Sequence, residues 1–130
     1  MPKAVPISLD NAFKALSFRG NRTPESNDID DAFCVLSDYR DGGIFLAYYA
    51  GNSEWERHTE GDELVMVLEG ETSLFVLGKN GERKSILKQG EIFVVPQGMW
   101  HRFESPTAVK IMTITPQPTD HSIETPVLSG

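Results

Sequence analysis

A series of short apolar runs, separated by turn residues, limits what this chain can fold into. Eight such runs, rich in β-branched and aromatic residues, cover residues 32–37, 43–50, 63–68, 72–77, 83–87, 91–95, 99–103 and 109–115. Asn80-Gly81 separates two of them and predicts a tight hairpin, because both residues tolerate positive φ at its central positions. Short strands at this spacing, with no long helical pattern, predict an all-β sandwich or barrel.

The length of 130 residues is that of a single domain with a buried core. We expect one domain over 1–130, divided into an N-terminal arm (1–30), a barrel core (31–116) and an extended C-terminal tail (117–130). Within the arm, Ser8 or Asp10 is placed to cap a short helix that buries Phe13 and Leu16. Residues 20–30 are expected to form a polar loop.

Several of the predicted strands are apolar on both faces. In the run 63–68, Val65 and Val67 share one face, and the three apolar residues that alternate with them share the other. One face can fill the interior of a barrel, whereas the other needs a second sheet or a second subunit to cover it. We therefore expect a homodimer in which sheet faces or edges pair.

The charge and the cysteine content exclude several classes of partner and compartment. The formal net charge of −7 and the pI near 4.9 argue against a nucleic-acid partner, which needs a basic surface. Cys34 has no second cysteine with which to form an internal disulfide. No apolar run approaches a membrane span, and residues 1–10 lack the pattern of a signal peptide. A cytoplasmic protein with a small-molecule ligand is expected.

Two histidines and two glutamates are predicted to meet although they lie far apart in the sequence. Glu56 and His58 are two residues apart, so on a strand both side chains face the same side. Glu63 begins the next run, across a turn, and its carboxylate can return to the same region. His101 shares a face with Met99, so it joins the other three if that face lines the barrel.

Such a group needs a compensating charge. Burying two imidazoles and two carboxylates in an apolar cavity is costly unless their charges are balanced. A divalent cation is the natural compensator, and imidazole with carboxylate is a ligand set for Fe(II), Mn(II), Zn(II), Ni(II) or Cu(II).

Around these residues the chain resembles the cupin superfamily, because it contains both family motifs at matching spacings. The first motif, G(x)5HxH(x)3,4E(x)6G, appears here as Gly51, Glu56-x-His58, Glu63 and Gly70. The second motif, G(x)5PxG(x)2H(x)3N, appears here as Gly90, Pro96-x-Gly98 and His101. The resemblance runs from about residue 48 to residue 103. It implies a double-stranded β-helix, or jelly-roll barrel, with a metal site in its mouth.

Two positions depart from the family pattern. Glu56 replaces the first histidine of the first motif, and Ser105 replaces the final asparagine of the second. The family set of three histidines and one glutamate becomes Glu56, His58, Glu63 and His101. With a second carboxylate, a divalent ion leaves the site neutral rather than positive, which makes it a weaker Lewis acid. The harder oxygen ligands favour Fe(II) or Mn(II), with Zn(II) and Ni(II) as the other candidates.

Other arrangements of this site stay open at the level of the sequence. Two histidines and one glutamate would leave positions free on Fe(II), and Glu56 would then be a catalytic general base. Glu56 also belongs to an acidic stretch that reads as a solvated loop. Asp62 competes with Glu63 for the ligand position, because the family tolerates a shorter spacer. Loss of the metal is a further alternative.

Two classes of function follow from the resemblance. The first is a metal-dependent enzyme that acts on a small polar organic molecule by dioxygenation, or by isomerase or lyase chemistry. The second is a non-enzymatic barrel, with or without metal, that binds a sugar or a carboxylate for sensing or storage. An anionic ligand would need a cation near the mouth, for which Arg40, Arg57 and Arg102 are the candidates. His121 lies in the tail and is expected to be exposed, outside the metal site.

Overall fold

The computed structural model describes residues 1–27 and 30–128. Residues 28 and 29 of the expected loop and residues 129 and 130 of the expected tail therefore lie outside the described residues. The described elements are α1 (Leu9–Lys14), β1 (Arg19–Arg22), the short 3-10 helix η1 (Asp30–Ala32), β2 (Phe33–Tyr39), β3 (Gly42–Asn52), β4 (Trp55–His58), β5 (Glu63–Glu69), β6 (Glu71–Gly78), β7 (Gly81–Lys88), β8 (Ile92–Val95), β9 (His101–Pro116) and β10 (Thr119–Ser122).

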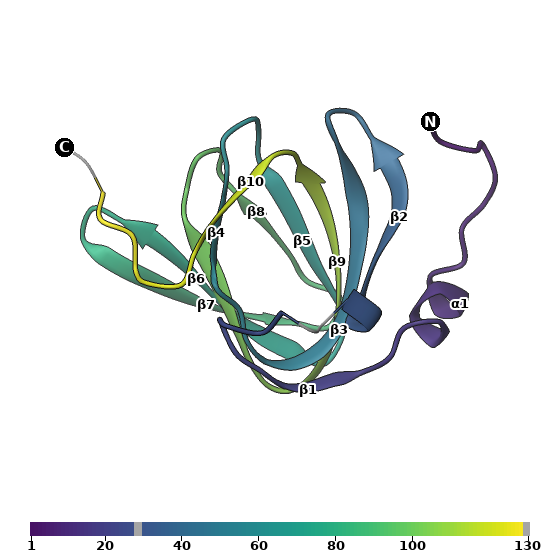
Figure 1. Cartoon of the computed structure of the whole chain (residues 1–130), viewed down its shortest axis with the longest axis horizontal. Coiled ribbons are helices and arrows are strands. Elements are labelled where there is room, and N and C mark those ends of the chain that lie inside the picture. Colours follow the sequence, from purple (N-terminus) through teal and green to yellow (C-terminus); the bar gives the residue numbers. More distant parts are fainter. Residues whose placement is uncertain (28–29, 129–130) are drawn as a thin grey trace.

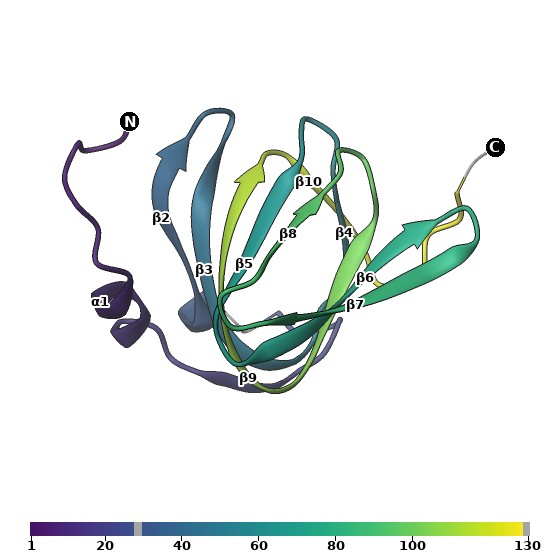
Figure 2. The same ribbon diagram turned by 180° about the vertical axis from the view of Figure 1, so that it is seen from behind.

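The strands curve around a common interior, as Figures 1 and 2 show from opposite sides. The hairpin of β6 and β7 extends on one side of the barrel, and α1 lies on the other. The longest strand, β9, pairs with β3, β4, β5 and β6, because two of the predicted runs join into one bent strand of 16 residues. The all-β barrel predicted from the sequence is confirmed.

Three strands of four residues each, β1, β4 and β10, add to the eight predicted runs. Strand β1 pairs in parallel with β3, within a segment expected to be a loop. Strand β10 pairs antiparallel with β4, within the segment expected to be a tail. Neither β1 nor β10 carries an apolar alternation, so their pairing partners, rather than their own sequences, make them strands.

The barrel interior contains the apolar core. Of the two apolar faces of β5, the one with Val65 and Val67 is fully buried, in a cluster that also contains Tyr49, Leu74 and Ile111. The opposite face of β5 is half-buried. The expected homodimer stays a prediction.

The helix cap and the tight hairpin predicted from the sequence both form, but the hairpin turn lies one residue earlier than predicted. The Oγ atom of Ser8 accepts a hydrogen bond from the backbone N–H of Asn11 at 3.1 Å, which caps helix α1 and its buried Phe13. The predicted hairpin forms, but its two-residue loop is 79–80 and Gly81 opens β7 with φ +101°. Among the described residues, no helix is long and apolar enough to cross a membrane.

Candidate metal centre

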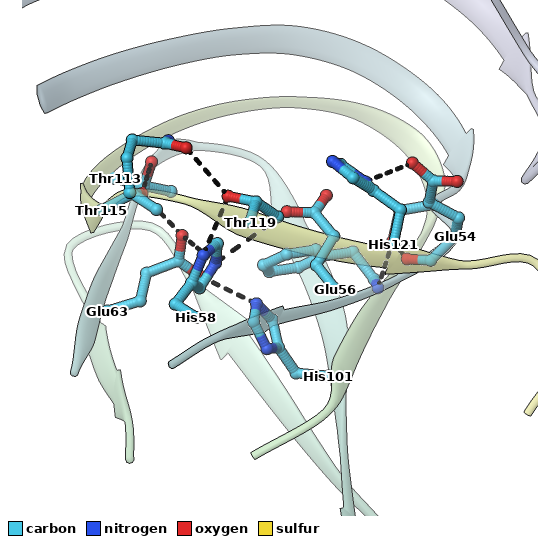
Figure 3. Close-up of polar contacts among 12 residues, drawn as sticks. Glu54, Glu56, His58, Glu63, His101, Thr113, Thr115, Thr119 and His121 are labelled. Carbon is cyan, nitrogen blue, oxygen red and sulfur yellow. Dashed lines mark hydrogen bonds and ion pairs between the residues drawn. The ribbon is translucent and has the colours of Figure 1, made fainter. Parts of the chain in front are cut away.

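The sheet brings together all four side chains that were predicted to meet. Strand β4 carries Glu56 and His58, β5 begins with Glu63, and β9 begins with His101. In the antiparallel pairing of β4 with β9, Glu56 lies opposite His101. Figure 3 shows the four side chains converging inside the barrel.

The distances between the polar atoms define a compact cluster. The Oε1 atom of Glu63 lies 2.9 Å from His101 Nε2, and its Oε2 atom lies 3.2 Å from His58 Nε2. Glu56 Oε2 lies 4.0 Å from His58 Nε2. One ligand atom each from Glu56, His58 and His101 lie within 4.8 Å of one another. Glu63 thus contacts both imidazoles, and Glu56 lies close to the same point.

Hydrogen bonds at the Nδ1 atoms orient both rings. His101 Nδ1 lies 3.2 Å from the carbonyl oxygen of Met99, which can only accept, so Nδ1 carries the proton. His58 Nδ1 lies 3.0 Å from Thr119 Oγ1, whose own proton is directed to the side-chain oxygen of Gln117 at 3.3 Å. These partners assign the Nδ1–H tautomer to both neutral rings and turn both Nε2 lone pairs towards the cluster.

Hydroxyl groups of β9 also fix the orientation of the Glu63 carboxylate. Thr115 Oγ1 donates a hydrogen bond to Glu63 Oε2 at 2.6 Å, and Thr115 Oγ1 lies 2.8 Å from Thr113 Oγ1. Both threonines belong to β9, the strand that also carries His101. The same strand therefore supplies one imidazole and the hydroxyl that positions the opposing carboxylate.

Three buried polar atoms at this point lack an aligned hydrogen bond: His58 Nε2, His101 Nε2 and Glu63 Oε1. With both rings in the assigned tautomer, nitrogen lone pairs face carboxylate oxygens, which is unfavourable in a buried site without a positive charge between them. Two ligand atoms bound at right angles to an ion at about 2.1 Å lie about 3 Å apart, close to the separations found here. The donor set therefore fits a divalent transition metal.

Protonation is the other way to supply positive charge. Burial alone would raise the pKa of Glu63, but the imidazoles of His101 and His58 outweigh it and hold that pKa at about 2. Burial alone would lower the pKa of His101, but the carboxylate of Glu63, and more weakly that of Glu56, raises it. Without a metal, the pair is therefore an imidazolium beside a carboxylate.

Glu56 differs from Glu63 in its exposure. Its side chain keeps 24% of its accessible surface, against 5% for Glu63. Partial burial raises the pKa of Glu56, and the nearby charge of Glu63 raises it further. Glu56 is therefore the carboxylate of the cluster that solvent and a ligand can reach.

A cavity of about 190 Å³ adjoins the cluster and has both Glu56 and Glu63 in its wall. The rest of its wall mixes apolar and polar side chains. The apolar ones include Phe33, Phe45, Leu46, Ala47, Phe103 and Ile111. The polar ones include Thr113, Thr115, Gln117 and Thr119, so the residues that orient Glu63 and His58 also face the cavity.

Arg22 is the one cation among the described residues that line this cavity. The sequence did not single it out, because β1 shows no pattern. Arg57 pairs instead with Asp120 at 2.7 Å, and Arg102 pairs with two glutamates. Arg40 is exposed on the loop between β2 and β3. None of the three arginines considered for the mouth lines the cavity.

The other residues considered from the sequence, Asp62, His121 and Ser105, lie outside the cluster. The carboxylate of Asp62 is exposed and accepts a hydrogen bond from the backbone of Gln97 at 2.7 Å, so Glu63 and not Asp62 reaches the cluster. His121 is 54% exposed and lies 2.6 Å from Glu54, farther along β10 than Thr119, which contacts His58 (Figure 3). Ser105 is buried against Thr72 at 2.7 Å.

Comparison with known sequences connects this cluster to a family. A family model described as "Cupin domain" matches residues 46–115, which is more than half of the chain. An uncharacterized protein of Bacillus subtilis, YdbB, is 31% identical over 70 residues, which are 54% of this chain and 59% of YdbB. The match thus spans less than two thirds of the length of that relative.

Comparison with solved structures supports the fold. A cupin-2 domain protein from Shewanella frigidimarina is 24% identical, with a TM-score of 0.65 over 85% of this chain and 94% of that chain. Hydroquinone 1,2-dioxygenase from Sphingomonas sp. TTNP3 is 16% identical, with a TM-score of 0.56 over 79% and 70% of the two chains. At these identities the likeness concerns the fold alone. Together with the family match, the barrel identifies this chain as a member of the cupin family.

Proposed function

We propose that this protein is a metal-dependent cupin enzyme that transforms a small polar organic molecule, with dioxygenation as the reaction class. His58, Glu63 and His101 would hold the metal, and Glu56 would be the fourth ligand. The observation that carries the proposal is the group of three buried, unaligned polar atoms on His58, Glu63 and His101. A bound ion would supply between them the positive charge that protonation of His101 supplies in its absence.

The ligand types favour Fe(II) or Mn(II). Two carboxylates and two imidazoles make a harder set than three imidazoles and one carboxylate. Two carboxylates also neutralise the charge of a divalent ion, which makes the bound ion a weaker Lewis acid. A bound ion would supply open coordination positions and, as Fe(II), electrons for chemistry with O₂.

Glu56 is proposed for a second role beside that of a ligand. Its carboxylate faces the cavity and keeps contact with solvent, whereas Glu63 is enclosed by Thr115 and two imidazoles. Glu56 is therefore placed to accept a proton from a hydroxyl or an activated C–H group of a bound molecule. The apolar wall of the cavity limits water around that molecule.

The choice of dioxygenation rests on the ligand set and on one fold neighbour. The Sphingomonas protein of the same fold is a hydroquinone 1,2-dioxygenase, solved with 4-hydroxybenzoate bound. The apolar wall here includes three phenylalanine rings, which suit a flat ring in the cavity. Hydroquinone and 4-hydroxybenzoate are thus suitable first test compounds.

Metal analysis is the first test of this proposal. Protein purified without added metal should contain Fe or Mn close to one ion per chain, measured by elemental analysis. The same protein should consume O₂ with at least one phenol or small carboxylate of a test panel. Added Fe(II) or Mn(II) should raise the melting temperature of chelator-treated protein, because a ligand that binds only the folded state stabilises it.

The competing function is a binding barrel without catalysis. Protein that lacks bound metal, and whose melting temperature does not respond to Fe(II), Mn(II), Zn(II) or Ni(II), would contradict the metal-dependent enzyme. Bound metal without O₂ consumption would leave the site assignment intact and remove the dioxygenase.

A further inference from the structure

Strand β1 places the Arg22 side chain in the wall of the cavity, and its backbone lies unusually close to β3. Arg22 lies opposite Gly51 in the parallel pairing of the two strands. A Cβ atom at Gly51 would lie 2.2 Å from the carbonyl oxygen of Arg22 and 2.4 Å from its nitrogen. The φ of Gly51 is +116°, and that of Asn21 is +55°. Gly51 and the bend at Asn21 thus allow the backbone of Arg22 to press against β3.

The guanidinium of Arg22 packs among aromatic rings rather than acids. It lies 4.6 Å from the ring centroid of Tyr49 and 5.0 Å from that of Phe33. In the part of the chain that the structure describes, no carboxylate forms an ion pair with Arg22. The rings hold the stem and plane of the guanidinium, whose charge also acts on the Glu56 carboxylate and the Tyr49 hydroxyl without an ion pair to either.

The charges of the cavity favour an anion once a metal is bound. Glu56 and Glu63 contribute two negative charges, which a divalent ion cancels. Arg22 then leaves one positive charge in excess, close to the apolar wall. A ligand with one negative charge would neutralise the cavity, and a neutral ligand would leave the guanidinium partly desolvated and unpaired.

The size and the lining of the cavity restrict the rest of the ligand. Its volume of about 190 Å³ is below the about 300–1,000 Å³ of sites for drug-sized molecules. Phe33, Phe45 and Ile111 are apolar residues of its wall, and the Phe33 ring lies against Arg22. Glu56 and Glu63 belong to the same wall and need a polar group of the ligand.

We propose that Arg22 is the specificity-determining residue of this cavity, and that the ligand is a small organic carboxylate. Its carboxylate pairs with the Arg22 guanidinium, and its apolar body lies against Phe33 and Phe45. The polar end opposite the carboxylate faces Glu56. This inference deepens the proposed function and rests on it for the charge count, but the pairing with Arg22 is testable by itself.

Benzoate and benzamide are matched probes, because they share a shape and differ in charge. By calorimetry at neutral pH, metal-loaded wild-type protein should bind benzoate at least about tenfold more tightly than benzamide. Arg22→Met keeps an apolar stem without the charge, and it should reduce benzoate affinity by about tenfold or more. Arg22→Lys should keep part of the preference for benzoate.

Arg40→Gln is the matched control, because it removes an exposed arginine that lies outside the cavity. It should leave benzoate affinity within about twofold of the wild-type value. The melting temperature of each variant separates loss of binding from loss of folding. Equal benzoate affinity of the wild-type and Arg22→Met proteins, or equal affinity of wild-type protein for benzoate and benzamide, would overturn the assignment of Arg22.

The same titrations on chelator-treated protein separate the two proposals. If benzoate binding depends on the metal but not on Arg22, the carboxylate binds at the metal, and the Arg22 assignment fails while the metal site stands. If purified protein holds no metal, yet benzoate binding is lost in Arg22→Met, the metal proposal fails while the role of Arg22 stands.

Discussion

The two ends of the cavity are built in different ways. At one end, Glu56, His58 and His101 are placed by antiparallel register, which fixes the faces of β4 and β9 residue by residue. At the other end, Arg22 is placed by a short parallel strand with a register shift and a residue in the left-handed region. The first end can be inferred from residue spacing, whereas the second depends on how closely two backbones approach.

This difference suggests that the two ends can vary independently. Glu63 and His101 begin the longer strands β5 and β9, which carry buried core residues, so the geometry of the cluster is tied to the stability of the barrel. Strand β1 lies at an end of the pairing order and contacts β3. The metal end should therefore be rigid and the Arg22 end adjustable, and the following experiments test that contrast.

Loss of one imidazole should have the largest effect, and only at the metal end. His101→Ala should reduce bound metal from near stoichiometric to less than about a tenth, because a buried ligand is removed. Benzoate should bind more weakly without the metal charge, but the binding that remains should still depend on Arg22. His121→Ala is the control, since that imidazole is exposed and pairs with Glu54. Equal metal content in both variants would falsify the assignment of His101.

Acid should weaken the metal end in the metal-free protein. The pKa of Glu63 falls from 4.5 to about 2 on folding, so this carboxylate stabilises the fold above pH 4.5 and loses that effect as the pH falls towards 2. The raised pKa of His101 has the opposite sign, and its contribution is complete below pH 6.5 and lost as the pH rises through the folded-state pKa. The pair therefore stabilises most between pH 4.5 and 6.5.

Urea unfolding across this pH range measures the effect of the pair. Between pH 4.5 and 2, metal-free wild-type protein should lose about 3 kcal/mol of unfolding free energy more than Glu63→Gln does. Glutamine keeps the size of the side chain without its charge. Parallel pH profiles for the two proteins would show that Glu63 and His101 do not form the charged pair described here.

A methyl group at Gly51 should disturb the Arg22 end. Gly51→Ala combines a positive φ with a clash against the backbone of Arg22, and we expect a loss of about 3 kcal/mol of unfolding free energy. Gly81→Ala is the matched control, because Gly81 also has a positive φ but open space around it, and about 1 kcal/mol is expected. If the two variants lose equal stability, the close approach of β1 to β3 is not a constraint.

The smallest expected effect concerns the hydrogen bond behind His58. Thr119→Val keeps the side-chain shape and removes the oxygen that lies 3.0 Å from His58 Nδ1. Loss of such a partner typically weakens metal binding by about 10- to 100-fold. Competition with a fluorescent chelator measures the affinity, and Thr125→Val, at an exposed position, is the control. Unchanged affinity in Thr119→Val would mean that β10 does not orient the ring.

Individual residues show which positions in the fold could be predicted from the sequence and which could not. Val65 and Val67 were correctly placed on one face because a period of two is a local property of a strand, but the packing decided that this face fills the core. The sequence left open whether Arg57 or Arg102 reaches the mouth, and acids on neighbouring strands hold both elsewhere. Thr119 was assigned to a tail, because nothing in its own segment indicates that β4 would have a free edge.

The spacing of apolar runs was enough to predict an all-β sandwich or barrel, and two spaced motifs, through their resemblance to cupins, were enough to predict a barrel in which His58, Glu63 and His101 meet. The runs and the motifs are patterns that the order of residues specifies directly. Tertiary structure alone decided that β10 orients His58 and that β1 brings Arg22 into the cavity. Both depend on contacts between segments distant in the chain, where backbone fit rather than residue pattern selects the neighbour.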